Sequence, residues 1–376
     1  MDSLEKKIFT SSKRIVIKIG SSLLINAENG KINNDIISYI VNDIKELILT
    51  KKEVMLVSSG ALALGKHEIG LQNKALKTAD KQAAASVGQI LLVNAWQKAF
   101  SKNKIKCAQI LLTHLDAEIR KSSINARNTI ESLLKLKSIA IINENDTTAT
   151  KELRYGDNDQ LAARVAQITS SDLLILLSDV AGLYDKNPLK NPEAKLLKRI
   201  YRIDKYIEKM SDNTSSSISV GGMETKIKAA KISLASGCSM IITEGSKKNP
   251  ILGLKSGKDA SWFIANTSPR TARKKWISSQ MSAKASIVID NGAAKALKKG
   301  ASLLPAGIIS VRGFFEKGDV INVVDEIKNI ISVGLASYSS EEVKLIAGAK
   351  SAEIEKLLGY HDKDVIIHRD DMVIRD

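Results

Sequence analysis

The sequence lacks the motifs that define the commonest nucleotide-binding and metal-binding classes. It contains no G-x-x-x-x-G-K-[ST] P-loop and no G-x-G-x-x-G fingerprint, which excludes by motif the common P-loop enzymes and the dinucleotide-binding Rossmann domains. Its two cysteines, Cys107 and Cys238, are far apart in apolar, strand-like surroundings and do not have C-x-x-C spacing. We therefore expect buried structural thiols rather than a metal site or a disulfide.

Long apolar segments are also absent. No run reaches the roughly 18 residues that a membrane helix needs, and the first residues, Met1-Asp-Ser-Leu-Glu-Lys-Lys, lack the apolar core of a signal peptide. A chain of 376 residues, of which 44% are hydrophobic, is long and apolar enough for two folded domains. We expect a cytoplasmic protein without a membrane partner.

The formal net charge of +16 is unevenly distributed. Residues 280–376 hold 13 Lys and Arg against 14 Asp and Glu, so the whole positive excess lies in residues 1–279. There it consists of single lysines spread over helices and loops, without a basic run interleaved with aromatic residues. This pattern is typical of a solvated surface that attracts anionic substrates, and it argues against nucleic acid as a partner.

Apolar, strand-like runs alternate with amphipathic segments from residue 14 to about residue 245. This alternation predicts an α/β domain with a largely parallel sheet sandwiched by helices. The predicted strands begin at Arg14, Val54, Lys106, Ser138, Asp172 and Ser239. Helical spacing of apolar residues predicts helices over 36–48 and 83–100. Ligand sites in such sheets gather at the carboxyl ends of the strands, and polar clusters follow the predicted strands here too.

Two adjacent glycines run into a lysine in Val220-Gly-Gly-Met-Glu-Thr-Lys226. Gly221 and Gly222 can adopt backbone angles closed to other residues, so that their N–H groups could face a phosphate, and Lys226 adds a positive charge. The apolar spacing from Thr225 to Gly237 predicts a helix whose positive N-terminus lies at the site. An ordinary glycine turn before an amphipathic helix would give the same pattern.

Two predicted strands open into loops of small residues, in Arg14-Ile-Val-Ile-Lys-Ile-Gly-Ser-Ser22 and Val54-Met-Leu-Val-Ser-Ser-Gly-Ala61. Lys18 interrupts an otherwise apolar strand, where burying an unpaired ammonium group would lower the stability of the fold by several kcal/mol. We therefore expect an anion to meet Lys18 near the end of its strand.

Short polar side chains are concentrated in two further clusters, Ile141-Ile-Asn-Glu-Asn-Asp146 and Gly156-Asp-Asn-Asp159. Such residues can simply cap helices and close turns, and that interpretation stays open for each of them. A carboxylate among lysines can instead hold the lysines in place, while other carboxylates and amides bind a substrate ammonium group. Ser178-Asp179, at the end of a third strand, would meet the sugar or base of a nucleotide.

The α/β pattern ends after about residue 256. Residues 258–283 are typical of a linker, and short strands broken by glycine turns predict a small, mostly β domain over 284–376. Phe314 and Phe315 are expected to pack a turn into the core of this domain.

Taken together, these clusters resemble the glutamate 5-kinases, members of the amino acid kinase superfamily that carry a carboxyl-terminal PUA domain. The resemblance runs nearly end to end and assigns residues 12–257 to the kinase domain and 284–376 to a PUA-like domain. It is carried by Lys18-Ile-Gly20-Ser-Ser, Ser58-Ser-Gly-Ala61, Ile142-Asn-Glu-Asn-Asp146, Gly156-Asp-Asn-Asp159, Leu177-Ser-Asp179 with Gly182-Leu-Tyr184, Gly221-Gly-Met-x-Thr-Lys226 and His368-Arg-Asp-Asp-Met372.

The resemblance implies transfer of the γ-phosphoryl group of ATP to the γ-carboxylate of L-glutamate, the first step toward proline, with Mg²⁺ held mainly by ATP oxygens. Lys18 and Lys226 would flank the moving group, Gly20 and Gly60 would present N–H groups to it, and Asp159 would orient the lysines. No base is needed, because the acceptor carboxylate is already ionised at neutral pH.

The implied binding residues fall into two sets. Ser59, Asp146 and Asn158 match glutamate-binding positions, with Asn143 and Asp157 beside them. The nucleotide set consists of Lys18, Ser178, Asp179, Val220, Gly221, Gly222, Met223, Glu224, Thr225 and Lys226. The family has Thr in place of Ser178 and a Gly-Thr pair in place of Ser219-Val220, so the side chain of Val220 is a doubtful contact although its backbone remains available.

The resemblance also implies feedback inhibition by proline, a homo-oligomer (dimer or tetramer), and delivery of the product to a glutamyl phosphate reductase. Two alternatives stay open from the residues alone: another carboxylate, carbamate or phosphate kinase of the superfamily, and an RNA-binding protein acting through the PUA-like domain.

Overall fold

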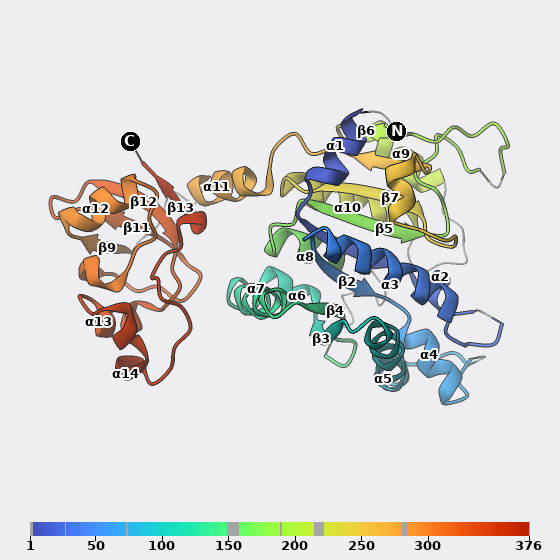
Figure 1. The fold of residues 1–376 in the computed structure, drawn as a ribbon, viewed down its shortest axis with the longest axis horizontal. Helices are drawn as coiled ribbons and strands as arrows, with labels where there is room; N and C mark the ends of the chain where they lie inside the picture. Colours follow the sequence, from blue (N-terminus) through green and yellow to red (C-terminus); the bar gives the residue numbers. More distant parts are fainter. Residues whose placement is uncertain are drawn as a thin grey trace. The chain divides into compact units, whose positions relative to one another are not determined.

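The computed structural model describes residues 3–26, 28–72, 74–148, 158–188, 190–213, 222–279 and 285–375. They form two compact units, Met1–Pro269 and Arg270–Asp376, each with its own hydrophobic core (Figure 1). No helix within these ranges is both long enough and apolar enough to cross a membrane.

The first unit is built on an eight-stranded sheet in the order β3-β4-β2-β1-β5-β7-β8-β6. Its strands are β1 (Arg14–Ile19), β2 (Glu53–Ser58), β3 (Lys106–Leu112), β4 (Ser138–Glu144), β5 (Leu173–Ser178), β6 (Arg199–Ile200), β7 (Ser239–Glu244) and β8 (Ala260–Phe263). Every pair of neighbours is parallel except β7 and β8. The predicted α/β class and largely parallel sheet are confirmed.

The six predicted strand starts agree with the structure to within one residue, since β2 begins at Glu53 and β5 at Leu173. Strands β6 and β8 were not predicted. They contain only two and four residues, too few for an apolar period to stand out.

Helices cover both faces of this sheet. They are α1 (Ser3–Ser11), α2 (Ser21–Leu24), α3 (Asn34–Leu49), α4 (Ala61–Glu68), α5 (Thr78–Lys102), α6 (His114–Glu118), α7 (Arg120–Lys135), α8 (Asn158–Ile168), α9 (Lys205–Asn213) and α10 (Met223–Ala235), with a 3₁₀ turn at Leu252–Ser256. The core on one face contains residues of α1, α3, α4 and α5, and the core on the other face contains residues of α7, α8, α9 and α10. The two helices predicted over 36–48 and 83–100 are α3 and α5.

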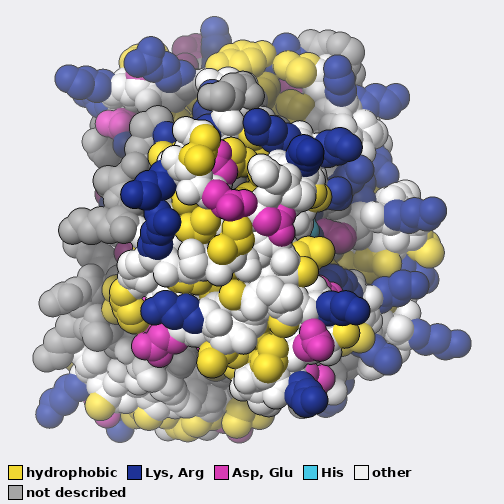
Figure 2. Space-filling view, turned by 90° about the vertical axis from the view of Figure 1, so that its left-hand side faces the viewer, with side chains coloured by type: hydrophobic (Ala, Val, Ile, Leu, Met, Phe, Trp, Pro, Cys, Tyr) yellow, Lys and Arg dark blue, Asp and Glu magenta, His cyan; other side chains and the backbone are white. Residues whose placement is uncertain are grey.

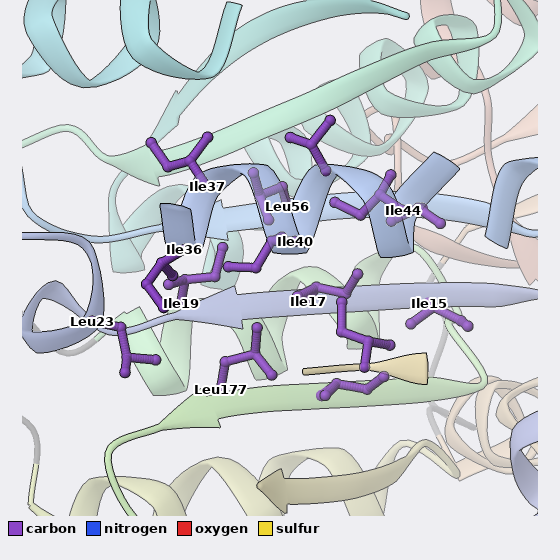
Figure 3. Close-up of a cluster of buried hydrophobic side chains, with 14 of the residues drawn as sticks. Ile15, Ile17, Ile19, Leu23, Ile36, Ile37, Ile40, Ile44, Leu56 and Leu177 are labelled. Atoms are coloured by element: carbon purple, nitrogen blue, oxygen red, sulfur yellow. The ribbon is translucent and has the colours of Figure 1, made fainter. Parts of the chain in front are cut away.

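The alternation of side chains along β1 decides which face each residue serves. Ile15, Ile17 and Ile19 pack beneath α3, where Figure 3 shows them opposite its isoleucines, whereas Val16 belongs to the core on the other face. Successive strand residues point to opposite faces, so Lys18 lies on the same face as Val16, under α8 and α10.

The second unit has a five-stranded sheet in the order β10-β9-β11-β12-β13, parallel only between β9 and β11. Its elements are α11 (Pro269–Ser279), β9 (Ser286–Ile289), α12 (Asn291–Lys298), β10 (Ile308–Arg312), β11 (Val320–Val324), β12 (Ile330–Leu335), α13 (Ser340–Ile346), α14 (Ile354–Leu358) and β13 (Met372–Ile374). A small β domain is therefore present where it was predicted.

The residues interpreted as a linker, 258–283, contain regular structure. Strand β8 belongs to the sheet of the first unit, and α11 packs Ile277 onto Val320 and Val333 in the second unit. Ile277 is the one residue of α11 that is buried, which explains why this basic helix has the composition of a linker.

Two smaller expectations have mixed outcomes. Phe315 is 2% exposed and lies in the core of the second unit, but Phe314 is 68% exposed, so the prediction that both phenylalanines pack inward is wrong for Phe314. Cys107 and Cys238 are free thiols, the first half-buried and the second buried.

Candidate active site

A buried carboxylate on α8 contacts lysine side chains of two other elements, β1 and α10. Asp159, in the first turn of α8, is 1% exposed. Its Oδ1 lies 2.6 Å from Nζ of Lys18 on β1, and its Oδ2 lies 3.2 Å from Nζ of Lys226 on α10. The anion expected near Lys18 is therefore Asp159, 141 positions further along the chain.

The two lysines determine the charge state of this carboxylate. Burial alone would raise the pKa of Asp159, but the ammonium groups of Lys18 and Lys226 outweigh burial and hold that pKa well below its usual range. The hydroxyl of Thr225 also reaches Asp159 Oδ2, at 2.8 Å. Asp159 is thus ionised at neutral pH, and one negative charge holds two positive charges in a nearly dry setting.

Glycine plays different parts in the three small-residue loops. Gly60 has φ 112° and precedes α4, so a side chain at this position would be strained. Gly20 precedes α2 with an ordinary φ of −73°. Gly222 precedes α10 with φ −66° and would accept a Cβ without contacts, so the conformational freedom predicted for it is not used.

Amide and hydroxyl side chains form a second group around Asn158, the residue next to Asp159 in the sequence. Asn158, the first residue of α8, donates from Nδ2 to Ser59 Oγ and to Asn143 Oδ1, both at 2.9 Å. Asn143 in turn donates from Nδ2 to Gln89 Oε1, at 2.6 Å. Gln89 lies on α5 and was not singled out from the sequence, because nothing in a helical pattern marks one glutamine as facing a strand end.

Asp146 follows the end of β4 and is half-buried. Burial raises the pKa of its carboxyl from 3.8 to about 6. No cation is paired with it among the residues that the structure describes. It is therefore ionised at neutral pH but poorly compensated, which favours the binding of a cationic group.

These groups line one cavity of about 250 Å³. The predicted residues on its wall are Lys18, Gly20, Ser59, Gly60, Asn143, Asp146, Asn158, Ser178, Asp179 and Lys226. Residues on the wall that were not assigned a role from the sequence are Ser21, Ser22, Ala61, Leu62, Ala63, Lys66, Glu144 and Leu177. Lys66 had a weak signal, since it follows Gly60 by six residues on the helix that begins there.

Not every predicted residue reaches the cavity. Met223 is buried in the core, and Glu224 pairs with Lys228 at 2.7 Å, so neither lines the wall. Thr225 contributes through Asp159 instead. Asp157, Val220 and Gly221 lie outside the described residues.

Ser178 and Asp179 follow β5 on the cavity wall, and Ser178 Oγ donates to Asp179 Oδ1 at 3.0 Å. Within the described ranges, no group of three or more His, Cys, Asp or Glu side chains could hold a metal ion.

Comparisons with known proteins show the families that the two units match. The amino acid kinase family matches residues 13–244, and the PUA domain matches residues 285–358. The chain is similar to a glutamate 5-kinase of Agrobacterium fabrum, with 49% identity over 372 residues that cover 99% of this chain and 95% of the relative. A glutamate 5-kinase of Paramagnetospirillum magneticum is 46% identical over 364 residues, covering 97% and 98%.

Among solved structures, UMP kinase from Ureaplasma parvum is similar with a TM-score of 0.49 and 18% identity, covering 67% of this chain and 99% of that chain.

Proposed function

This chain belongs to the amino acid kinase family, among its glutamate 5-kinases, and on that premise we propose how its cavity performs the reaction. The enzyme transfers the γ-phosphoryl group of ATP to the γ-carboxylate of L-glutamate, which gives L-glutamyl 5-phosphate on the route to proline. The observation that carries the mechanism is the Lys18–Asp159–Lys226 arrangement at the cavity wall.

The two lysines stabilise the charge on the group in transfer. Phosphoryl transfer requires little covalent help from the protein, so catalysis consists of positioning and charge neutralisation. Lys18 and Lys226 lie on opposite oxygens of Asp159, which fixes both ammonium groups before substrate binds. Such prearranged charges act strongly in a water-poor site. Backbone N–H groups beside Gly20 and Gly60 add donors.

Recognition of glutamate takes place where Ser59, Asn143, Asp146 and Asn158 line the cavity, which we call the glutamate end. Asp146 would bind the α-ammonium group, and Asn158 with Ser59 would complete the hydrogen bonds of the amino acid head. Lys66, on the same wall and without an ion pair among the described residues, would attract the α-carboxylate. This arrangement leaves the γ-carboxylate to point toward Lys18 and Lys226.

The nucleotide would enter from the side of Ser178 and Asp179, with the N-terminus of α10 behind its phosphates. Mg²⁺ would arrive bound to ATP and neutralise phosphate charge there. Gly222 leads into α10, whose N–H groups and positive end favour an anion.

We also propose an inhibitor, a partner enzyme, a cellular location and an oligomeric state for this enzyme. Proline carries the same α-amino and α-carboxylate groups as glutamate, so it would compete for Asp146 and Asn158. The acyl phosphate product is labile and would pass to a glutamyl phosphate reductase. The enzyme would act in the cytoplasm as a dimer or tetramer.

An acceptor screen tests the assignment. The protein is incubated with ATP and Mg²⁺ and with L-glutamate, N-acetylglutamate, aspartate, carbamate or UMP, and acyl phosphate is trapped as the hydroxamate while ADP release is followed. L-Glutamate should give the highest kcat/KM. Equal or better turnover of another acceptor would overturn the glutamate assignment.

A further inference from the structure

A line of side-chain hydrogen bonds connects helix α5 to the glutamate end of the cavity. Gln89 Oε1 accepts from Asn143 Nδ2, Asn143 Oδ1 accepts from Asn158 Nδ2, and Asn158 Nδ2 also donates to Ser59 Oγ. Asn143, Asn158 and Ser59 line the cavity, whereas Gln89 does not. We call these four residues the amide relay.

In each amide of the relay, the hydrogen-bond partners decide which end donates and which end accepts, and a backbone carbonyl fixes the first of these orientations. A side-chain amide has nearly the same shape when its oxygen and nitrogen are exchanged, so the hydrogen-bond partners must decide its orientation. The carbonyl oxygen of Ser58, which can only accept, lies 3.3 Å from Asn158 Nδ2. A reversed Asn158 would place two oxygens against each other. Asn158 therefore presents its nitrogen to this side, where its two hydrogens are shared among Ser58 O, Asn143 Oδ1 and Ser59 Oγ.

The remaining orientation follows from this anchor. Because Asn143 uses its oxygen toward Asn158, its nitrogen must face α5, where a buried N–H group requires an acceptor. Asn143 is 3% exposed, and Gln89 Oε1 is the acceptor that meets it. Gln89 thus stabilises the one orientation of Asn143 that is compatible with Asn158.

Helix α5 is held tightly enough to place this acceptor. A Cβ on Gly88 would lie 1.8 Å from the carbonyl oxygen of Ala61, so α5 crosses α4 with its backbone in direct contact. About two turns further along α5, Trp96 Nε1, which can only donate, reaches Ser58 Oγ at 2.9 Å. Ser58, whose carbonyl orients Asn158, and Gln89, which accepts from Asn143, are therefore both positioned by α5.

The direction of the relay determines what the cavity offers to a ligand. Asn158 Oδ1 is buried and accepts no hydrogen bond from the described residues. The oxygen of Ser59 already accepts from Asn158, so its hydrogen remains to be donated. Asn158 lines the cavity with its Oδ1 unpaired among the described residues, and a buried acceptor of this kind is satisfied by a ligand that donates, as the ammonium group of an α-amino acid does.

We propose that Gln89 is a positioning residue for substrate specificity: by accepting from Asn143 it holds Asn158 with its oxygen available to the substrate ammonium group. The proposal rests on the glutamate kinase function. Removing the acceptor would leave Asn143 Nδ2 unsatisfied, allow Asn143 to rotate, and release Asn158 from its orientation.

The test compares two ligands that differ in the ammonium group. KM for L-glutamate and the inhibition constant Ki of glutarate, which lacks the amino group, are measured for the full chain and for Gln89→Met and Gln89→Glu. Methionine keeps the length of the side chain and removes the acceptor, whereas glutamate keeps an acceptor oxygen. Gln109→Leu, at an exposed position of β3, is the control for an unrelated glutamine.

For Gln89→Met we expect KM for glutamate to rise by about tenfold, the value of one lost hydrogen bond in a buried site, with Ki of glutarate and KM of ATP within about twofold. Gln89→Glu should stay within about threefold of the original KM, and Gln109→Leu should be unchanged. If Gln89→Met does not fold, as judged by thermal unfolding, Gln89→Ala carries the same expectation.

Two results would overturn the proposal while leaving the proposed function intact: an unchanged KM for glutamate in Gln89→Met, or equal rises for glutamate and glutarate. Failure of the unmodified protein to phosphorylate glutamate would instead reject the function on which the proposal rests.

Discussion

The two ends of the cavity are held by different interactions. At the transfer end, Lys18 and Lys226 are fixed by the buried charge of Asp159. At the glutamate end, Asn158 and Ser59 are fixed by neutral hydrogen bonds whose direction starts from a backbone carbonyl. Charge neutralisation needs strong fields and tolerates small changes of angle, whereas recognition of an amino acid head needs donors and acceptors in the correct order. Changes at the first end should therefore lower kcat, and changes at the second end should raise KM.

The largest effect is expected for Asp159→Asn. Removing the charge leaves two buried ammonium groups facing each other, and breaking a buried ion pair in this way costs about 3–5 kcal/mol. Urea unfolding should show this loss in the free energy of unfolding, and MgATP should restore part of it by supplying an anion. An unfolding curve like that of the original protein would show that the carboxylate does not hold the lysines.

Lys226→Ala and Lys18→Ala come next. Each removes a charge that acts on the transferring group, so kcat should fall on the order of 10²-fold or more while KM for ATP changes less. Lys228→Ala, in the same helix with a side chain that is 52% exposed, is the control and should keep its activity. Near-original kcat at saturating substrate would make the substituted lysine merely structural.

The glutamate end should respond to pH through Asp146. Its pKa is raised by burial to about 6, so the carboxylate gains a proton as pH falls through that value and loses its attraction for the ammonium group. We expect kcat/KM for glutamate to fall toward about tenfold per pH unit below pH 6. Asp146→Asn should raise KM and remove this slope.

The pH dependence of kcat/KM that is due to Asp146 has to be distinguished from the titration of other groups at the site. The other ionisable side chains on the cavity wall are Lys18, Lys66, Glu144, Asp179 and Lys226. If the acidic slope persists in Asp146→Asn, one of those groups or the substrate itself is responsible, and Asp146 is not the ammonium partner.

A smaller effect is expected for Lys66→Met. A partly exposed ion pair with the α-carboxylate is worth about 1 kcal/mol or less, so KM for glutamate should rise by about fivefold at most and kcat should stay constant. Lys45→Met, at an exposed position of α3, is the matched control. Raising the ionic strength should reduce the difference between the Lys66 variant and the original protein. A drop in kcat instead would place Lys66 at the transfer end.

The smallest effect is expected from removing the second unit. All cavity residues belong to the first unit, so a chain ending at Ser268, before α11 begins, should phosphorylate glutamate with kcat within about threefold of the full chain. Residues 280–376 hold 13 Lys and Arg against 14 Asp and Glu, and charged side chains of both signs reach the face seen in Figure 2. Salt-sensitive binding of structured RNA by the full chain, lost on truncation, would contradict this interpretation of the second unit.

Much of the fold could be predicted from the sequence because its signals are local. An apolar strand such as Ile15–Ile19 and a period such as that of α3 are visible in a few neighbouring residues, and burial then follows from alternation. Strands β6 and β8, with two and four residues, and α11, with one buried residue, escaped prediction for the same reason. Their few buried side chains acquire meaning only against a surface supplied by distant residues.

The site residues also fall into those that local sequence could identify and those that only the tertiary structure could. Lys18 could be identified from the sequence, since a lysine inside an apolar strand requires an anion wherever the chain folds. Its partner could not be derived from local pattern, because Asp159 is brought to it by the crossing of α8 beneath β1 and β5. The raised pKa of Asp146, the place of Lys66 on the wall and the acceptor at Gln89 depend likewise on which groups surround them. Residue type and period are properties of the chain, but charge state and hydrogen-bond direction are properties of an environment, and that environment exists only once the tertiary structure has formed.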